Sequence, residues 1–208
     1  MNLKDTVFSL SEAYGASGSE SPAAELACGM LKEYCPDAEI IGGSVIGTLG
    51  EKGLPELLLD AHIDQVGMIV TQVDGEGFLT VAPSGGIDIR ALPSREVTVH
   101  GKQDIPAVFC STPPHLASGE TVYDDISRIK LDTGLGEMAK NIVSVGDYVT
   151  FSALPTELSG DLVSGRSFDD RAGVACLIKT AEMLSGKLLP CNVAFLLSDA
   201  EELGMRGA

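Results

Sequence analysis

The segment ELLLDAHID, residues 56–64, constrains the fold of this chain more than any other. Its centre, LLLDA, offers apolar side chains to both faces of a strand. Such a pattern is typical of strands that are covered on both sides, as in the sheets of α/β proteins. We therefore expect a central, doubly covered strand here, with helices packed against it.

The segments on either side of this strand fit an α/β domain. Apolar residues recur at helical spacing in residues 3–14, 22–34 and 170–184, which predicts three helices. Residues 38–50 predict two strands that are interrupted at Gly42-Gly43, and the apolar run NVAFLL (192–197) predicts another strand.

The pattern changes between about Val66 and Leu158. Short β-type runs such as GMIVTQV and REVTVHG alternate with turns rich in Gly, Pro and Asp, and one short helix is expected near Val122 to Leu131. This predicts a small β-barrel or sandwich. The expected architecture is an α/β, mixed-sheet domain formed by residues 1–65 and 160–208, with residues 66–159 inserted as a β-domain.

The charge of the chain narrows the class of partner. Thirty acidic residues against fourteen basic ones give a formal net charge of −16. Because contacts to phosphates require clustered Lys and Arg, we expect no binding to nucleic acid or to an anionic membrane. No apolar run approaches the roughly 20 residues of a membrane-spanning helix.

The five cysteines are odd in number, irregularly spaced and without a CxxC pair, which argues against a cysteine-based zinc site. Reduced thiols fit a cytoplasmic protein. The first fifteen residues lack the continuous apolar stretch of a signal peptide.

The polar end of the ELLLDAHID strand offers an imidazole and a carboxylate. His62 and Asp64 are two residues apart, and strand residues at this spacing face the same side. They would lie at the edge where α/β domains usually bind ligands. The pair fits a metal-bound His oriented by a carboxylate, but equally a structural ion pair at a strand end.

Two acidic pairs occur at the beginnings of other elements. Asp169-Asp170 opens the helix after SGRSF, and Glu201-Glu202 follows the strand NVAFLL. Acids at a helix start stabilise its free N–H groups, which would account for either pair. A second interpretation of the Asp pair is a carboxylate that bridges two metals, because its two oxygens diverge. In the Glu pair, one acid could bind a metal while its neighbour holds a water as a general base.

Imidazole and carboxylate donors together suit zinc, cobalt or manganese. HExxH is absent, so the chain is not a zincin, and it has neither a GxSxG elbow nor a P-loop.

Three ordered motifs make the chain similar to a known family. AHIDQVGMIV (61–70), SFDDRAGVA (167–175) and AEELGMRGA (200–208) resemble those of the tetrahedral or glutamyl aminopeptidases, two-metal peptidases whose members often carry the label endoglucanase. GASGSE (15–20) also fits the layout of that family, and the resemblance covers the whole chain.

The resemblance implies a role for each candidate residue. His62 and Glu202 would each bind one of two divalent metal ions, zinc or cobalt, and Asp169 would bridge both. Glu201 would be the general base, and Asp64 would orient His62. The implied reaction is removal of an N-terminal residue from a peptide. The inserted β-domain would build homo-oligomers, from dimers to twelve-subunit shells, in the full-length form.

The ligand count predicts that part of the site is missing. Two metals that share an Asp need about four further protein donors, and one acid and one imidazole remain unassigned. In the family both follow the Glu pair; His100 and His115 are not expected to replace them. We therefore expect a C-terminally truncated, inactive chain.

Two other functions remain open. One is a non-catalytic assembly module that acts through the β-domain. The other is glycoside hydrolysis by a carboxylate pair, which would leave His62 unexplained in a chain without Trp.

Overall fold

The computed structural model describes residues 1–51, 56–111, 113–116 and 125–208. The chain forms two compact units, Met1–Gln65 with Leu154–Ala208, and Val66–Ala153. The chain thus returns to the first unit at Leu154, six residues earlier than the sequence predicts. The reason is a two-stranded hairpin (β10, Thr156–Glu157; β11, Val163–Ser164) that packs with the first unit.

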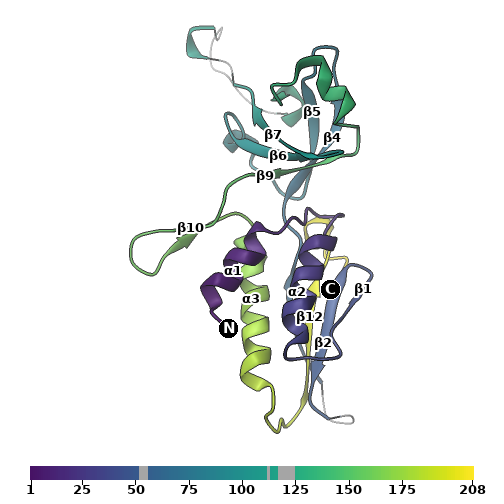
Figure 1. Cartoon of the computed structure of the whole chain (residues 1–208), viewed down its shortest axis with the longest axis vertical. Helices are drawn as coiled ribbons and strands as arrows, with labels where there is room; N and C mark the ends of the chain where they lie inside the picture. The colour runs from purple at the N-terminus through teal and green to yellow at the C-terminus, as the bar shows by residue number, and fades with distance from the viewer. Residues whose placement is uncertain (52–55, 112, 117–124) are drawn as a thin grey trace. The chain divides into compact units, whose positions relative to one another are not determined.

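The first unit is an α/β domain with a four-stranded mixed sheet, so the predicted fold class is confirmed. Figure 1 shows its helices packed beside the sheet. Its remaining elements are α1 (Leu3–Glu12), α2 (Ser21–Lys32), β1 (Glu39–Ile41), β2 (Ser44–Leu49), β3 (Glu56–His62), α3 (Phe168–Leu184), β12 (Asn192–Ser198) and the 3-10 helix η5 (Glu201–Leu203).

The sheet order is β1-β2-β12-β3, and it places two distant segments side by side. β12 pairs antiparallel with β2 and parallel with β3. In the parallel pair Ser198 lies opposite His62, and the Ile63 amide donates to the Ser198 carbonyl at 2.7 Å. The polar residues that follow β3 and β12 therefore lie together at the carboxyl ends of these two strands.

The core of the first unit lies between the helices and the sheet. Leu10 of α1, Leu31 of α2 and Ile178 of α3 are fully buried and pack in one cluster with Phe195 of β12. On β12 the alternate residues Val193, Phe195 and Leu197 face this cluster, as the pleat of a strand requires.

The cover expected for β3 is only partly present in the described residues. β3 was expected to be central and covered on both faces, but it is the last strand in the sheet order. Leu57 and Leu58 are 49% and 56% exposed, because neither a further strand nor a covering helix shields them within the described part of the chain.

The three predicted helices are confirmed with small shifts at their ends. α1 ends at Glu12 instead of reaching residue 14, and α2 covers Ser21–Lys32. α3 contains a break at its start, since Asp169 and Asp170 have non-helical backbone angles and regular helix begins after them.

The second unit is a closed barrel, which confirms the predicted β-domain. Its strand order is β4-β5-β8-β7-β6-β9 and its interior is filled by apolar side chains such as Phe109, Leu79 and Met68. Its elements are β4 (Gly67–Val73), β5 (Leu79–Ser84), η1 (Ile89–Ala91), β6 (Glu96–His100), β7 (Asp104–Phe109), η2 (Pro114–Leu116), η3 (Ile126–Arg128), β8 (Leu131–Asp132), η4 (Gly136–Asn141) and β9 (Tyr148–Phe151).

Of the short helix predicted near Val122 to Leu131, residues 122–124 lie outside the described residues, and the 3-10 turn η3 occupies part of the rest.

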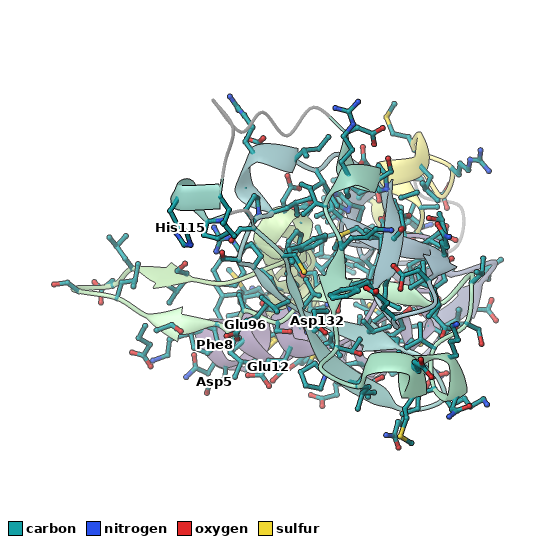
Figure 2. All side chains as sticks on the ribbon, turned by 90° about the horizontal axis from the view of Figure 1, so that it is seen from above. Asp5, Phe8, Glu12, Glu96, His115 and Asp132 are labelled. Atoms are coloured by element: carbon teal, nitrogen blue, oxygen red, sulfur yellow. The ribbon has the colours of Figure 1, made fainter. Side chains whose placement is uncertain are left out.

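Each unit also carries a shallow surface groove. On the barrel, a groove of about 420 Å³ is flanked by Glu96 and Asp132, which are labelled in Figure 2. In the first unit, a groove of about 350 Å³ runs between α1 and the β10–β11 hairpin, and Phe8 lines it. Asp5 and Glu12 lie along the same side of α1 as Phe8 (Figure 2).

Candidate metal centre

The ends of β3 and β12 assemble the candidate site within the first unit. His62 is the last residue of β3, and Glu201 and Glu202 begin η5, three residues after β12 ends. Ala200 turns the chain between them in a left-handed conformation, with φ of 48°. A non-glycine residue in this region is typical of a constrained functional turn.

His62 lies between two carboxylates. Its Nδ1 is 3.2 Å from Asp64 Oδ1 and its Nε2 is 3.1 Å from Asp169 Oδ1. The hydrogen bond with Asp64, opposed by burial and assisted by the contact with Asp169, raises the pKa of His62 to about 9. The imidazole is therefore protonated at neutral pH when no metal is bound.

Asp64 is completely buried and has more partners than the sequence indicates. Its carboxylate accepts the amides of Glu201 and Glu202, each at 3.1 Å, and the hydroxyl of Ser17 at 2.5 Å. Burial alone would raise the pKa of Asp64. The hydrogen bonds from His62, Ser17 and the two amides outweigh burial and lower that pKa, so the group is a carboxylate.

The two neighbouring aspartates, Asp169 and Asp170, have different environments. Asp169 is 92% exposed at its side chain and reaches His62. Asp170 instead accepts the amide of Gly173 at 3.0 Å, so it caps the regular part of α3. Capping thus accounts for Asp170, whereas Asp169 contacts His62 instead.

His62, Glu201 and Glu202 form a group that fits a metal ion. Each offers one ligand atom, and the three atoms lie within 4.8 Å of one another. One imidazole nitrogen and two carboxylate oxygens are suitable donors for zinc, cobalt or manganese. Asp169 is outside this group of three, but its contact with His62 Nε2 places it beside the same imidazole.

Two features that position the site were missed in the sequence. Arg171 is fully buried, and its guanidinium donates to backbone carbonyls, including Ile63 at 3.0 Å and Leu10 at 2.5 Å. Burial lowers its pKa to about 10. Since Ile63 separates His62 from Asp64, Arg171 ties the start of α3 to the backbone of the site.

The second missed feature is the loop 15–20. A Cβ at Gly15 would lie 2.5 Å from Nη2 of Arg171, so glycine is required there by close packing rather than as the end of α1. The motif GASGSE marked this loop in the sequence, but without a role.

His100 lies in the barrel and has both ring nitrogens engaged. Nδ1 is 2.9 Å from Asp104 and Nε2 is 2.9 Å from the buried hydroxyl of Thr150. This is the pattern of a structural histidine.

Imidazole and carboxylate donors that meet at the ends of adjacent parallel strands are typical of metal centres in α/β domains. Residues 43–208 match the model of the M42 glutamyl aminopeptidase family, and the chain belongs to this family. His62, Asp64, Asp169, Glu201 and Glu202 all fall within the matched residues.

Individual relatives agree with this assignment. The chain is 28% identical to the glutamyl aminopeptidase of Lactococcus lactis, over all of this chain and 62% of that protein. It is 28% identical to the lysyl aminopeptidase of Pyrococcus furiosus, over 95% of this chain and 59% of that one.

Among solved structures, the TET1 peptidase of Pyrococcus horikoshii superposes with a TM-score of 0.90 at 30% identity, covering 99% of this chain and 63% of the other. That peptidase can assemble into a tetrahedron or a large octahedral shell. The chain thus spans about 60% of the length of these relatives.

Proposed function

We propose that this chain carries part of the metal centre of an aminopeptidase, an enzyme that hydrolyses the N-terminal residue from a peptide. The observation that carries the proposal is the convergence of His62, Glu201 and Glu202 at the ends of two parallel strands, in a chain of the M42 family. His62 and Glu202 would be ligands of divalent metal ions, and Asp169 would bridge two of them.

A divalent ion held here would supply a Lewis acid that polarises the scissile carbonyl and lowers the pKa of water. The remaining chemistry belongs to the protein. Glu201 would take a proton from the attacking water and pass it to the leaving amine, as a general base and then a general acid. Asp64 would keep the proton of His62 on Nδ1, which leaves Nε2 free as a donor atom.

The donor count explains why we also propose that the 208-residue chain has little activity alone. Two tetrahedral metals sharing Asp169 would still require one carboxylate and one imidazole beyond those of His62 and Glu202. About two fifths of the length of these relatives lies outside the stretch that this chain matches, so a continuation of the chain is the source we propose for these donors.

Metal binding tests the proposal. Titration of the 208-residue protein with Co²⁺, followed by visible absorption, should give a site that His62→Gln and Glu202→Gln weaken at least tenfold. Glu25→Gln, an exposed acid on α2, is the matched control and should leave the affinity unchanged. The proposal fails if wild-type protein binds no Co²⁺ or if the variants bind as tightly as the control.

Activity is the second test. Glutamyl-, lysyl- and leucyl-anilides should be hydrolysed slowly or not at all with Zn²⁺ or Co²⁺ present. Rapid turnover that Glu201→Gln abolishes would support the aminopeptidase assignment but show that the donor count is wrong.

We further propose that the barrel unit mediates assembly into homo-oligomers. The support is the shell-forming TET1 peptidase, together with the exposed apolar side chains of Leu135, Met138 and Val145 on the barrel, which are 37%, 64% and 66% exposed. Light scattering tests this: Met138→Asp with Val145→Asp should reduce the mass of any oligomer, and a strictly monomeric wild-type protein would contradict the proposal.

Within the described residues, no helix combines the length and apolarity needed to cross a bilayer.

A further inference from the structure

The loop 15–20, GASGSE, contributes no ligand to the proposed metal centre, yet it makes a direct contact with it. We propose that Ser17 is a positioning residue that fixes the Asp64 carboxylate and, through it, the backbone of Glu201 and Glu202. This inference rests on the proposed function, because the geometry that Ser17 fixes is that of the proposed ligands.

Both oxygens of the buried Asp64 carboxylate accept hydrogen bonds. Oδ1 accepts the Glu201 amide at 3.1 Å and lies 3.2 Å from His62 Nδ1. Oδ2 accepts the Glu202 amide at 3.1 Å and the Ser17 hydroxyl at 2.5 Å. The carboxylate thus accepts three hydrogen bonds, and the His62 ring, whose Nδ1 is also 3.2 Å from the Asp64 backbone carbonyl, lies against Oδ1 as its ion-pair partner.

These three donors and the His62 ring come from three separate parts of the chain. His62 belongs to the end of β3, and the two amides belong to η5 after β12. Ser17 is the donor from the third part, the loop between α1 and α2. Its hydroxyl therefore adds a contact that fixes the rotation of the carboxylate from outside the two strand ends, where the two amides and the His62 ring lie.

The loop holds Ser17 firmly enough for this role. Ala16 pairs with Gln65 as a short parallel bridge, in which the Ser17 amide donates to the Gln65 carbonyl and the Gln65 amide donates to Gly15. Glu20, which is 7% exposed, accepts the Gly18 amide at 2.5 Å and closes the loop. Ser17 itself is 1% exposed, so water does not compete for its hydroxyl.

Loss of the hydroxyl would leave Oδ2 with one donor in a site that is closed to solvent. The carboxylate would then be free to rotate away from the amides it now accepts, and the Glu201–Glu202 turn would lose its anchor. Outer partners of metal ligands typically change metal affinity 10- to 100-fold, and a comparable effect is expected here.

Ser17→Ala tests the inference, and Ser11→Ala is its matched control. Ser11 is also a fully buried serine of the first unit, and its hydroxyl donates to the backbone carbonyl of Arg166 at 2.6 Å. The first readout is NMR hydrogen exchange at the amides of Glu201 and Glu202, compared with the amide of Phe195 in β12. The second is the dissociation constant for Co²⁺.

In Ser17→Ala, exchange at Glu201 and Glu202 should accelerate about tenfold relative to Phe195, and the Co²⁺ dissociation constant should rise about tenfold. Ser11→Ala should change neither. Equal acceleration at Phe195 would indicate general destabilisation and overturn the inference, as would unchanged exchange at the two glutamates. If wild-type protein binds no Co²⁺, the proposed function fails while the exchange data still decide the role of Ser17.

Discussion

A proton on His62 should compete with any metal at this centre. In the structure both ring nitrogens face carboxylates, Asp64 on Nδ1 and Asp169 on Nε2, and the pKa of His62 is raised to about 9. A metal ion can bind Nε2 only after the proton there is lost and the contact with Asp169 is rearranged. Metal affinity should therefore depend strongly on pH.

The magnitude follows from the pKa. With a pKa near 9, only about 1% of His62 is neutral at pH 7, so the apparent affinity should be roughly 100-fold weaker than that of the neutral imidazole. Between pH 6 and 8 the apparent dissociation constant should fall about tenfold per pH unit. Each metal ion should release close to one proton from this residue.

Calorimetric titration with Zn²⁺ or Co²⁺ at pH 7, in buffers of different ionisation enthalpy, counts that proton. An ordinary histidine with a pKa near 6.5 would release only about a quarter of a proton at this pH. A count near one quarter, with affinity that levels off above pH 7, would refute the reasoning. Asp64→Asn is the informative variant, because it removes the hydrogen bond that raises the pKa most and should move the protein toward that ordinary behaviour.

The remaining predictions concern stability and the division of roles between the aspartates. Because its folded pKa is raised, His62 stabilises the metal-free fold fully below about pH 6.5, and this contribution, at most about 3 kcal/mol, is lost as pH rises through 9. Urea unfolding between pH 6 and 8.5 should show the decline, and a decline that persists in His62→Gln would contradict it. Asp169→Asn should weaken Co²⁺ binding about tenfold and lower the free energy of unfolding only by the small part of the His62 contribution that this 92% exposed side chain supplies. Asp170→Ala should instead cost about 1 kcal/mol of stability through loss of the α3 cap and leave Co²⁺ affinity intact; the reverse pattern would show that the two roles are exchanged. Phe195→Ala should cost about 3–5 kcal/mol in chemical denaturation, because it opens a cavity between sheet and helices, and a loss below 1 kcal/mol would argue against this core.

The elements of the fold were readable from the sequence because their signals are local. Apolar spacing predicted α1, α2 and α3, and the turn residues Gly42-Gly43 predicted the break between β1 and β2. The barrel was readable because its short strands alternate with turns. In each case the pattern lies within a few residues of the chain.

The position of β3 was not readable in the same way. Its three leucines predicted a strand covered on both faces. This pattern indicates only that these apolar side chains would be stabilised by burial under other elements. Which strand or helix supplies the cover is decided by distant parts of a chain. In the described residues β12 covers one edge of β3, and Leu57 and Leu58 remain exposed.

The acidic pair Asp169-Asp170 shows the same limit. The two residues are identical neighbours, and no local rule predicts that they have different environments. The difference arises because His62, more than a hundred residues away in the chain, contacts only Asp169.

Asp64 illustrates how far a correct local rule extends. The spacing of two residues placed it beside His62, and the 3.2 Å contact agrees with that expectation. The same rule gave it a single partner, whereas its carboxylate accepts donors from the loop 15–20 and from η5 as well. Each oxygen of a buried carboxylate usually has at least one hydrogen-bond donor, so the burial of Asp64 indicates further partners. Because those donors include the amides of both Glu201 and Glu202, the acidic pair is held through its backbone.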